Sequence, residues 1–279
     1  MKQHDISLLD IPISLDCNLS CDNCNAYSNL KVTSTRQNKQ SLEKDLLNWK
    51  PFINPLKLQI IGGEPLLYKD LPSLIYTARE IFPKTDLRLF SNGLLLKKNL
   101  HLAQVLNDTN CMLVISIHSK DKRYEKLLKD NIKSFIGDYT GYKIKNPTLS
   151  FAKTFRKKDK FTFELRNMTG HWTQVYKEGI KPFNSNYKDA HKVCLWSHCT
   201  QLYKGKLWKC TQTAFFDDLM KRINNHEDWE QYKKIYKPLS YNDSTDTKEK
   251  WFNNLLNPEP VCSMCREKET DVIYDKKIW

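Results

Sequence analysis

The stretch from Cys17 to Cys24 reads Cys-Asn-Leu-Ser-Cys-Asp-Asn-Cys, so three cysteines follow one another with the spacing C-x3-C-x2-C. Three thiolates this close together can hold three irons of a 4Fe–4S cluster, and the fourth iron then lacks a protein ligand. A zinc site is the alternative, with His4 or Asp16 as fourth ligand, but zinc sites usually contain C-x2-C pairs. The spacing favours an iron–sulfur cluster with one open position.

Short apolar strands and amphipathic helices alternate around this stretch, which predicts a parallel sheet with helices outside it. Strands are expected at Ile11–Leu15, Lys57–Ile61, Asp86–Phe90, Met112–Ile117, Thr148–Thr154 and Phe161–Arg166. Helices are expected at Ser41–Trp49 with Ser41 as N-cap, at Leu71–Phe82, around Leu100–Leu106, at Asp217–Asn225 and at Trp229–Tyr236.

A second motif, Gly62-Gly63-Glu64-Pro65, directly follows the second expected strand. Two glycines let the backbone approach a ligand closely, and Glu64 can accept a hydrogen bond from a cationic amino group. By itself the motif would predict only a turn. In this order and context, the two motifs together resemble the radical S-adenosylmethionine (radical SAM) superfamily.

The resemblance implies an α/β fold, a partial (β/α)6 TIM-like barrel with the three cysteines in the loop at its C-terminal mouth. It also implies that S-adenosylmethionine chelates the open iron and is split by one electron to a 5′-deoxyadenosyl radical, which takes a hydrogen atom from substrate. The cofactor-binding residues implied are Gly62, Gly63, Glu64, Pro65, Asn92, Ser116 and His118. Relatives commonly carry an aromatic residue before the third cysteine, where this chain has Asn23. Either backbone contacts to adenine suffice in this chain, or Tyr27 or Phe90 provides the apolar wall.

The other cysteines form a second group. Cys194 is followed by Gly205 and Cys210, and Cys262-Ser-Met-Cys265 comes far downstream. This pattern resembles the SPASM/Twitch auxiliary-cluster domains, and a hairpin is expected at 202–209. Because no cysteine follows Cys265, the shorter Twitch form is implied, with one auxiliary 4Fe–4S cluster and the ligands Cys194, Cys210, Cys262 and Cys265. Cys199 is the alternative to Cys194 as a ligand. A zinc module with four cysteine ligands is the alternative to the auxiliary iron–sulfur cluster. Cys111 is expected in the core. The expected divisions are a core (1–168), a bridge (169–190) and a Twitch-like domain (191–279).

Composition sets the limits on location and partners. The chain has 279 residues, and no apolar run in it approaches the roughly 20 residues that span a bilayer. The N-terminus lacks the apolar core and cleavage site of a signal peptide, so a cytoplasmic location without a membrane partner is expected. A net charge of +13 indicates either a lysine-rich solvated surface or an anionic partner.

Three functions are compatible with these features. The first is a radical SAM oxidoreductase that oxidises or dehydrogenates a small polar or anionic metabolite, passes an electron to the auxiliary cluster and takes electrons from a donor such as flavodoxin or ferredoxin. The second is a maturase that crosslinks or epimerises a ribosomal peptide, although only 16 residues precede Cys17. The third is a non-catalytic metal-binding nucleic-acid protein. No catalytic base is assigned, and candidate substrate-facing residues are His171, Trp172, Tyr176 and Asp217.

Overall fold

The structure, a computed structural model, describes residues 3–22, 24–30, 35–137, 143–145, 152–156, 160–169, 175–224 and 227–268. The strands in these ranges are β1 (His4–Ile6), β2 (Leu8–Pro12), β3 (Ile53–Pro55), β4 (Lys57–Ile61), β5 (Asp86–Ser91), β6 (Met112–Ile117), β7 (Lys143–Lys145), β8 (Ala152–Arg156), β9 (Phe163–Asn167), β10 (Cys199–Tyr203), β11 (Lys206–Trp208) and β12 (Leu239–Ser240). The α-helices are α1 (Lys39–Trp49), α2 (Leu71–Ile81), α3 (Leu102–Thr109), α4 (Lys122–Ile136), α5 (Tyr187–Lys192), α6 (Thr211–Ala214), α7 (Phe216–Met220), α8 (Glu227–Ile235) and α9 (Thr245–Asn254). Short 3₁₀ turns lie at Pro65–Leu67, Leu96–Lys98 and Pro260–Met264.

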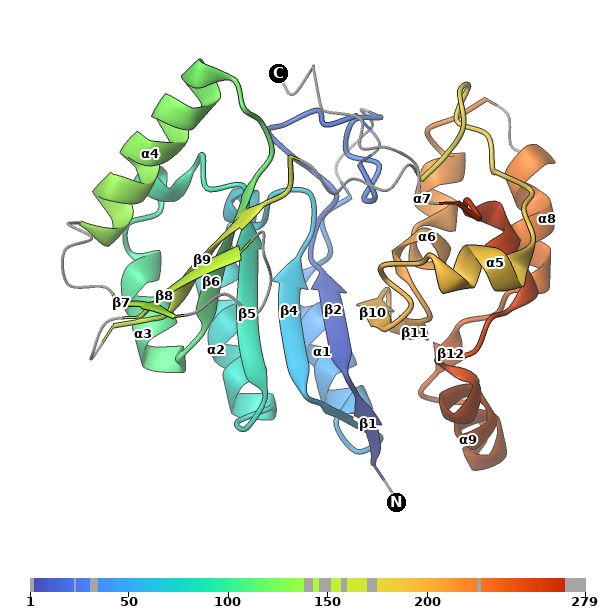
Figure 1. Ribbon diagram of the computed structural model, residues 1–279. Helices are drawn as coiled ribbons and strands as arrows, with labels where there is room; N and C mark the ends of the chain where they lie inside the picture. Colours follow the sequence, from blue (N-terminus) through green and yellow to red (C-terminus); the bar gives the residue numbers. More distant parts are fainter. Residues whose placement is uncertain are drawn as a thin grey trace.

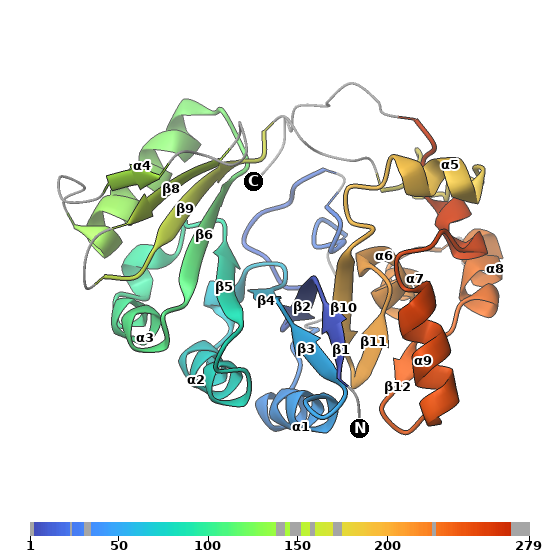
Figure 2. The same ribbon diagram turned by 60° about the horizontal axis from the view of Figure 1, so that its bottom comes forward.

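The main sheet has the strand order β12-β11-β10-β2-β4-β5-β6-β9-β8-β7 in the described part of the chain. The strands from β10 to β9 in this order are parallel, and antiparallel hairpins extend the sheet at both ends. The parallel strands follow an arc with α1 to α4 on its outer side (Figures 1 and 2). This is the predicted partial (β/α)6 TIM-like barrel, as an open sheet whose sixth parallel strand, β10, lies beside β2.

Alternation along the strands gives the sheet two different faces. Leu9, Leu58 and Leu89 belong to one apolar core with Leu46 of α1 and Leu74 of α2, so their face lies against the helices. The intervening residues point to the concave face, and many of them are polar. The register lines up Asp10, Gln59, Arg88 and Gln201, and farther along the strands it pairs Ser116 with Arg166.

The predicted elements are largely present, with shifted boundaries. The predictions for Lys57–Ile61 and Met112–Ile117 are confirmed as β4 and β6. The first strand ends at Pro12, because Ser14 and Leu15 bond instead to Gly63 and to the side chain of Thr35. The N-cap assignment to Ser41 is wrong: Oδ1 of Asn38 accepts from the backbone N–H of Ser41 at 3.2 Å.

Differences are larger in the second half of the chain. The strand expected at Thr148–Thr154 begins at Ala152 within the described residues, and β8 runs antiparallel to β9. The helix expected at Asp217–Asn225 is the shorter α7. The predicted hairpin is present as β10 and β11, and Lys204 (φ 51°) and Gly205 (φ 76°) form its turn, which requires positive φ at both positions.

The N-terminal and C-terminal parts share their cores. Leu202 and Leu207 of the hairpin belong to the main core, whereas Leu15 and Tyr27 from the loop after β2 belong to a second core with Trp229 of α8. The sheet therefore continues across the expected boundary at 191, and the three-part division stays a prediction. Among the described helices, none has the length and apolar character needed to cross a bilayer.

Candidate iron–sulfur sites

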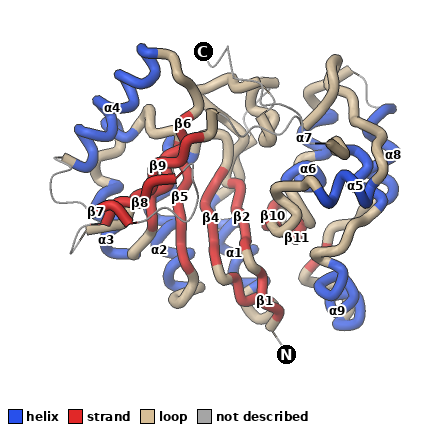
Figure 3. Tube along the Cα trace, viewed as in Figure 1, coloured by secondary structure: helices blue, strands red, loops and turns tan. Residues whose placement is uncertain are grey.

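The loop that follows β2 contains the first cysteine group, Cys17, Cys21 and Cys24. It lies above the ends of β2 and β4, among the long loops at that edge of the sheet (Figures 1 and 3). Its two ends are tied together: the backbone N–H of Gln37 donates to the carbonyl of Ile13 at 2.9 Å, and Leu15 donates to Oγ1 of Thr35 at 2.9 Å. These bonds close the loop independently of any metal.

The Gly-Gly-Glu-Pro segment packs directly against this loop. Gly63 donates to the carbonyl of Ser14 at 2.8 Å, and Glu64 donates to that of Asp16 at 2.7 Å. A Cβ added to Gly62 would lie 2.2 Å from the oxygen of Ser14, and one on Gly63 would lie 2.2 Å from that of Asp16. The glycines thus permit a close backbone approach to the segment that leads into Cys17, in addition to the ligand approach expected from the sequence.

Glu64 is fully buried and bonded within the chain. Its Oε1 accepts from the backbone N–H of Leu66 at 3.0 Å and from the hydroxyl of Ser91 at 2.8 Å, and its Oε2 accepts from the N–H of Asn92 at 2.7 Å. Burial raises the pKa of this carboxyl to about 7, and the three donors oppose that rise. The side chain joins the ends of β4 and β5, and the expectation that it also receives the cofactor's amino group stays a prediction.

Asn92 connects β5 to the cysteine loop. Its Nδ2 donates to Oδ1 of Asn18 at 2.8 Å, and its Oδ1 accepts from the N–H of Leu94 at 3.0 Å. Asn18 directly follows Cys17 in the chain. Pro65 begins a 3₁₀ turn on the other side of Glu64. The motif residues therefore form one bonded frame around the first cysteine group.

Ser116 and His118 lie at the end of β6, as expected. Burial lowers the pKa of His118 to about 4, so its ring is neutral near pH 7. The register places Ser116 beside Arg166 of β9, a residue that the sequence analysis did not select. Arg166 pairs with Glu164 at 2.6 Å and lies over the ring of Phe90 at 5.1 Å. The alternation of Glu164 and Arg166 along the expected strand is the sequence feature that could have identified Arg166.

The two candidates for the adenine wall have different surroundings. Phe90 lies under Arg166 on the concave face. Tyr27 is fully buried and stacks on Tyr176, with 6.2 Å between ring centroids. Burial raises the pKa of Tyr27 well above its usual value, and the neighbouring thiols of Cys265, Cys210 and Cys24 contribute to the rise. Tyr27 thus lies near cysteines of both groups, whereas Phe90 lies on the concave face.

Two of the remaining candidates, Tyr176 and Asp217, lie within the described residues and contact different partners. The hydroxyl of Tyr176 accepts from Nδ2 of Asn29 at 2.8 Å, and Asp217 forms an exposed ion pair with Lys233. Asn23, His171 and Trp172 lie outside the described residues.

The second cysteine group, Cys194, Cys210, Cys262 and Cys265, comes from three separate segments. Cys194 follows α5, Cys210 precedes α6, and Cys262 and Cys265 lie in and directly after the 3₁₀ turn Pro260–Met264. Burial raises the pKa of Cys265 well above its usual value, and the thiols of Cys210, Cys194 and Cys262 raise it further. The four sulfurs are therefore neighbours.

Specific bonds hold these segments together. Phe183 donates to the carbonyl of Met264 at 2.9 Å, and Ser185 donates to that of Ser263 at 2.8 Å, which places the approach to α5 along the 3₁₀ turn. Lys209, next to Cys210, is buried, and its Nζ lies 2.8 Å from Oε1 of Glu259. The hairpin and the Cys262 segment are thus joined by an ion pair directly beside the thiols.

The two other cysteines have different neighbours. Burial raises the pKa of Cys199, and Asp10 is the first of the charged neighbours that raise it further, ahead of Cys194 and Cys210. Cys199 begins β10, whereas Cys194 lies outside the sheet. Cys111 is fully buried in the main core, as the sequence predicts.

The chemistry of the donors fits iron–sulfur clusters. All nine cysteines are free thiols. Among the described residues, no group of three or more Cys, His, Asp or Glu side chains is arranged to hold a metal ion. Asp16 is bonded to Arg36 at 2.9 Å, and His4 stacks on Phe252 at 4.0 Å and pairs with Glu249. Both candidates for a fourth zinc ligand at the first group are thus engaged elsewhere, which favours a cluster with an open iron there.

Comparisons with known proteins match parts of the chain. A family model described as a 4Fe-4S single cluster domain matches residues 13–144. The chain is 31% identical over 140 residues to a probable GTP 3′,8-cyclase of Methanococcus aeolicus, covering 47% of this chain and 44% of that protein. It is 51% identical over 43 residues to the GTP 3′,8-cyclase of Staphylococcus saprophyticus, covering 15% of this chain and 13% of that protein. The chain thus spans less than half the length of these curated relatives.

A solved structure supports the fold over nearly the whole chain. The crystal structure of BtrN in complex with AdoMet and 2-DOIA matches with a TM-score of 0.53 and 15% identity, covering 97% of this chain and 98% of that one. At this level of identity the likeness shows the fold, which includes the C-terminal part as well as the partial barrel.

Proposed function

We propose that the chain is a radical SAM enzyme that reductively cleaves S-adenosylmethionine at the first cysteine group, as the family match to residues 13–144 and the fold support. Cys17, Cys21 and Cys24 would hold a 4Fe–4S cluster, which when bound supplies the electron that yields the 5′-deoxyadenosyl radical for hydrogen abstraction from substrate. The observation that carries this proposal is the bonding of Gly63 and Glu64 to the residues that lead into Cys17. It supports a single site built from both motifs.

The residues around the mouth would bind and orient the cofactor. We assign cofactor contacts to the backbone of residues 62–65, to Ser116 and to Arg166, whose guanidinium carries the positive charge that a carboxylate requires. His118, neutral near pH 7, would act as a polar contact without charge. Glu64 and Asn92 would act on the cofactor indirectly, by holding the loops at the ends of β4 and β5 in place.

The second cysteine group would bind an auxiliary 4Fe–4S cluster. Cys194, Cys210, Cys262 and Cys265 supply four thiols, enough to leave no iron open, so this group suits electron acceptance better than substrate ligation. We favour Cys194 over Cys199, because the thiol of Cys265 has Cys194 among its neighbours and the first charged neighbour of Cys199 is Asp10. Tyr27 is near cysteines of both groups, and this nearness supports electron transfer from one region to the other.

The concave face supports an oxidation or dehydrogenation of a small polar or anionic metabolite. Its side chains include Arg88, Arg166 and Gln59, which can bind hydroxyl and anionic groups. A low-potential electron donor such as flavodoxin or ferredoxin would supply the electrons. The nine free cysteines suit a reducing, cytoplasmic location.

Iron counting and cofactor cleavage test this function. The anaerobically reconstituted chain should bind about eight irons and eight sulfides, and about four after Cys17, Cys21 and Cys24 are replaced together by Ala. Cys262→Ala should still form 5′-deoxyadenosine with a chemical reductant, because the first group is intact. A wild-type chain that binds zinc alone, or a Cys262→Ala variant that no longer cleaves the cofactor, would contradict the proposal.

A further inference from the structure

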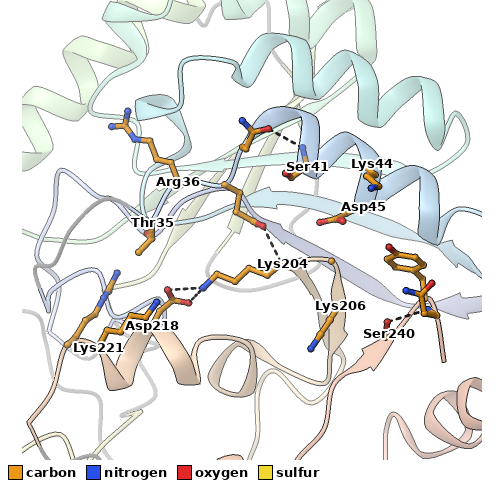
Figure 4. Close-up of a pocket in the computed structure, with 16 residues that line it drawn as sticks. Thr35, Arg36, Ser41, Lys44, Asp45, Lys204, Lys206, Asp218, Lys221 and Ser240 are labelled. Atoms are coloured by element: carbon orange, nitrogen blue, oxygen red, sulfur yellow. Dashed lines mark hydrogen bonds and ion pairs between the residues drawn. The ribbon is translucent and has the colours of Figure 1, made fainter.

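A pocket of about 750 Å³ lies on the outer side of the sheet, away from the concave face. Its walls come from the end of the cysteine loop, α1, the turn between β10 and β11, the region of α7, and residues 240–242. Figure 4 shows side chains from these segments around one hollow. We call it the basic pocket, after its lining residues Arg36, Lys44, Lys204, Lys206, Lys221 and Arg222.

The charge of this pocket is strongly unbalanced. Six Lys and Arg side chains line it, against the two carboxylates of Asp45 and Asp218. Asp218 is already neutralised by Lys204 at 2.7 Å (Figure 4). Among the described residues, Lys44, Lys206 and Lys221 form no ion pair, and all three are exposed. Three exposed lysines that form no ion pair therefore surround the opening, and of these Lys44 lies near the carboxylate of Asp45.

The inner wall of the pocket is bonded to the first cysteine loop. Nε of Arg36 lies 2.9 Å from Oδ2 of Asp16, which directly precedes Cys17. Nη1 of Arg222 donates to the carbonyl of Tyr27, three residues after Cys24. The same loop bonds to Gly63 and Asn92 elsewhere. The pocket thus reaches the iron-binding loop through Asp16 and Tyr27, and Asp16 also accepts a hydrogen bond from the backbone N–H of Glu64.

We propose that the basic pocket is the docking site for an acidic electron-transfer protein that reduces the site held by Cys17, Cys21 and Cys24. This inference rests on the proposed function, which requires one electron for each cofactor cleavage. In the docked complex the donor is oxidised by one electron and the first site is reduced by one, without transfer of an atom. Exposed lysines around an opening attract an acidic protein surface and accelerate its association.

Direct binding tests the docking site without relying on catalysis. The probe is a bacterial flavodoxin, which is acidic, and the target is the anaerobically reconstituted full chain. The variant Lys44→Glu/Lys206→Glu/Lys221→Glu should associate at least about tenfold more slowly at low salt, and its residual binding should depend less on salt. The matched control, Lys126→Glu/Lys129→Glu/Lys133→Glu, makes the same charge change on exposed positions of α4 and should leave the association rate within about twofold of wild type.

Two reductants separate this inference from the proposed function. Reduction by flavodoxin should slow in the pocket variant, while reduction by dithionite and dithionite-driven cofactor cleavage should stay at the wild-type level. Unchanged flavodoxin binding, or an equal loss in the α4 control, would overturn the docking site. The docking site would also be overturned if wild type bound inorganic phosphate or a nucleotide and the pocket variant lost that binding while flavodoxin binding persisted. That result would identify a small-anion site. Failure of wild type to cleave the cofactor with dithionite would instead contradict the proposed function.

Discussion

At the scale of single residues, Glu64 is the polar side chain most fully enclosed at the mouth of the sheet. It accepts hydrogen bonds from Leu66, Ser91 and Asn92, and the backbone N–H of Glu64 bonds to Asp16. One carboxylate thus connects the ends of β4 and β5 to the loop that contains Cys17. Its effect on the cofactor would come from holding these segments in place.

Glu64→Ala should lower both the stability of the protein and its affinity for S-adenosylmethionine. Removing the carboxylate leaves three buried donors without a partner, at about 1–3 kcal/mol for each group. Urea unfolding and equilibrium binding of the cofactor provide the two measurements. A variant with wild-type stability and weaker cofactor binding would instead indicate a direct contact with the cofactor's amino group.

Asp10 should make the stability of the protein depend on pH. Burial raises the pKa of Asp10 from 3.8 to about 7, and Nε2 of Gln201 opposes the rise from 2.7 Å. Between these pH values the folded state binds more protons than the unfolded state, so the free energy of unfolding decreases as the pH rises from about 4 to about 7. A shift of this size corresponds to about 2–4 kcal/mol.

Asp10→Asn should reduce the slope of stability against pH by the Asp10 contribution, leaving that of Glu64, whose pKa is also raised to about 7, and should stabilise the protein above about pH 7. Oδ1 of Asp10 and Oε1 of Gln201 are buried without a partner among the described residues, and the amide adds a donor beside them. Urea unfolding at about pH 5 and about pH 8 compares the two proteins. The same slope in wild type and variant would show that Asp10 does not titrate in this range.

At the scale of elements, the close packing of two loops determines the shape of the first site. Gly63→Ala should displace the cysteine loop, because the added Cβ would lie 2.2 Å from the carbonyl oxygen of Asp16. We expect the reconstituted variant to lose about four irons from the first group. Gly137→Ala is the control: its φ of 77° and ψ of −148° are strained for alanine, but no atom of the described residues lies within 4 Å of the added Cβ, so it should cost about 1–3 kcal/mol and no iron. Full iron content in Gly63→Ala would contradict the interlocked loops.

The hairpin of β10 and β11 positions the second site through Lys209. Lys209→Met leaves Glu259 and the carbonyls of Asn254 and Asn257 without their buried partner, at about 3–5 kcal/mol of stability. The loss of this pair should also release the irons of the auxiliary site while the first site stays loaded. Lys233→Met removes an exposed pair with Asp217 and should cost less than about 1 kcal/mol. Equal effects of the two substitutions would contradict this role of Lys209.

Local patterns in the sequence explain which elements could be predicted. β4 and β6 are short apolar runs with clear ends, and the cysteine and glycine motifs both directly follow strands, so the fold class and the first site could be inferred. The role of Glu64 could not, because its partners Ser91 and Asn92 are 27 and 28 residues away in sequence. The pairing of Ser116 with Arg166 likewise depends on the strand register, which no local pattern specifies.

At the scale of the whole molecule, the C-terminal part is joined to the partial barrel by both sheet and core. β10 pairs with β2, and Tyr27 from the N-terminal loop lies in the second core with Trp229. The two cysteine groups are therefore held by one continuous structure. This continuity is what a short, fixed path for electrons between the two sites requires.

The amount of 5′-deoxyadenosine formed per chain, with S-adenosylmethionine and dithionite, tests the central claim most directly. The reconstituted wild type should form it, and the variant in which Cys17, Cys21 and Cys24 are all replaced by Ala should form none, even with its auxiliary site loaded. An iron-loaded wild type that forms no 5′-deoxyadenosine, or a triple variant that forms as much as wild type, would contradict the assignment of this site.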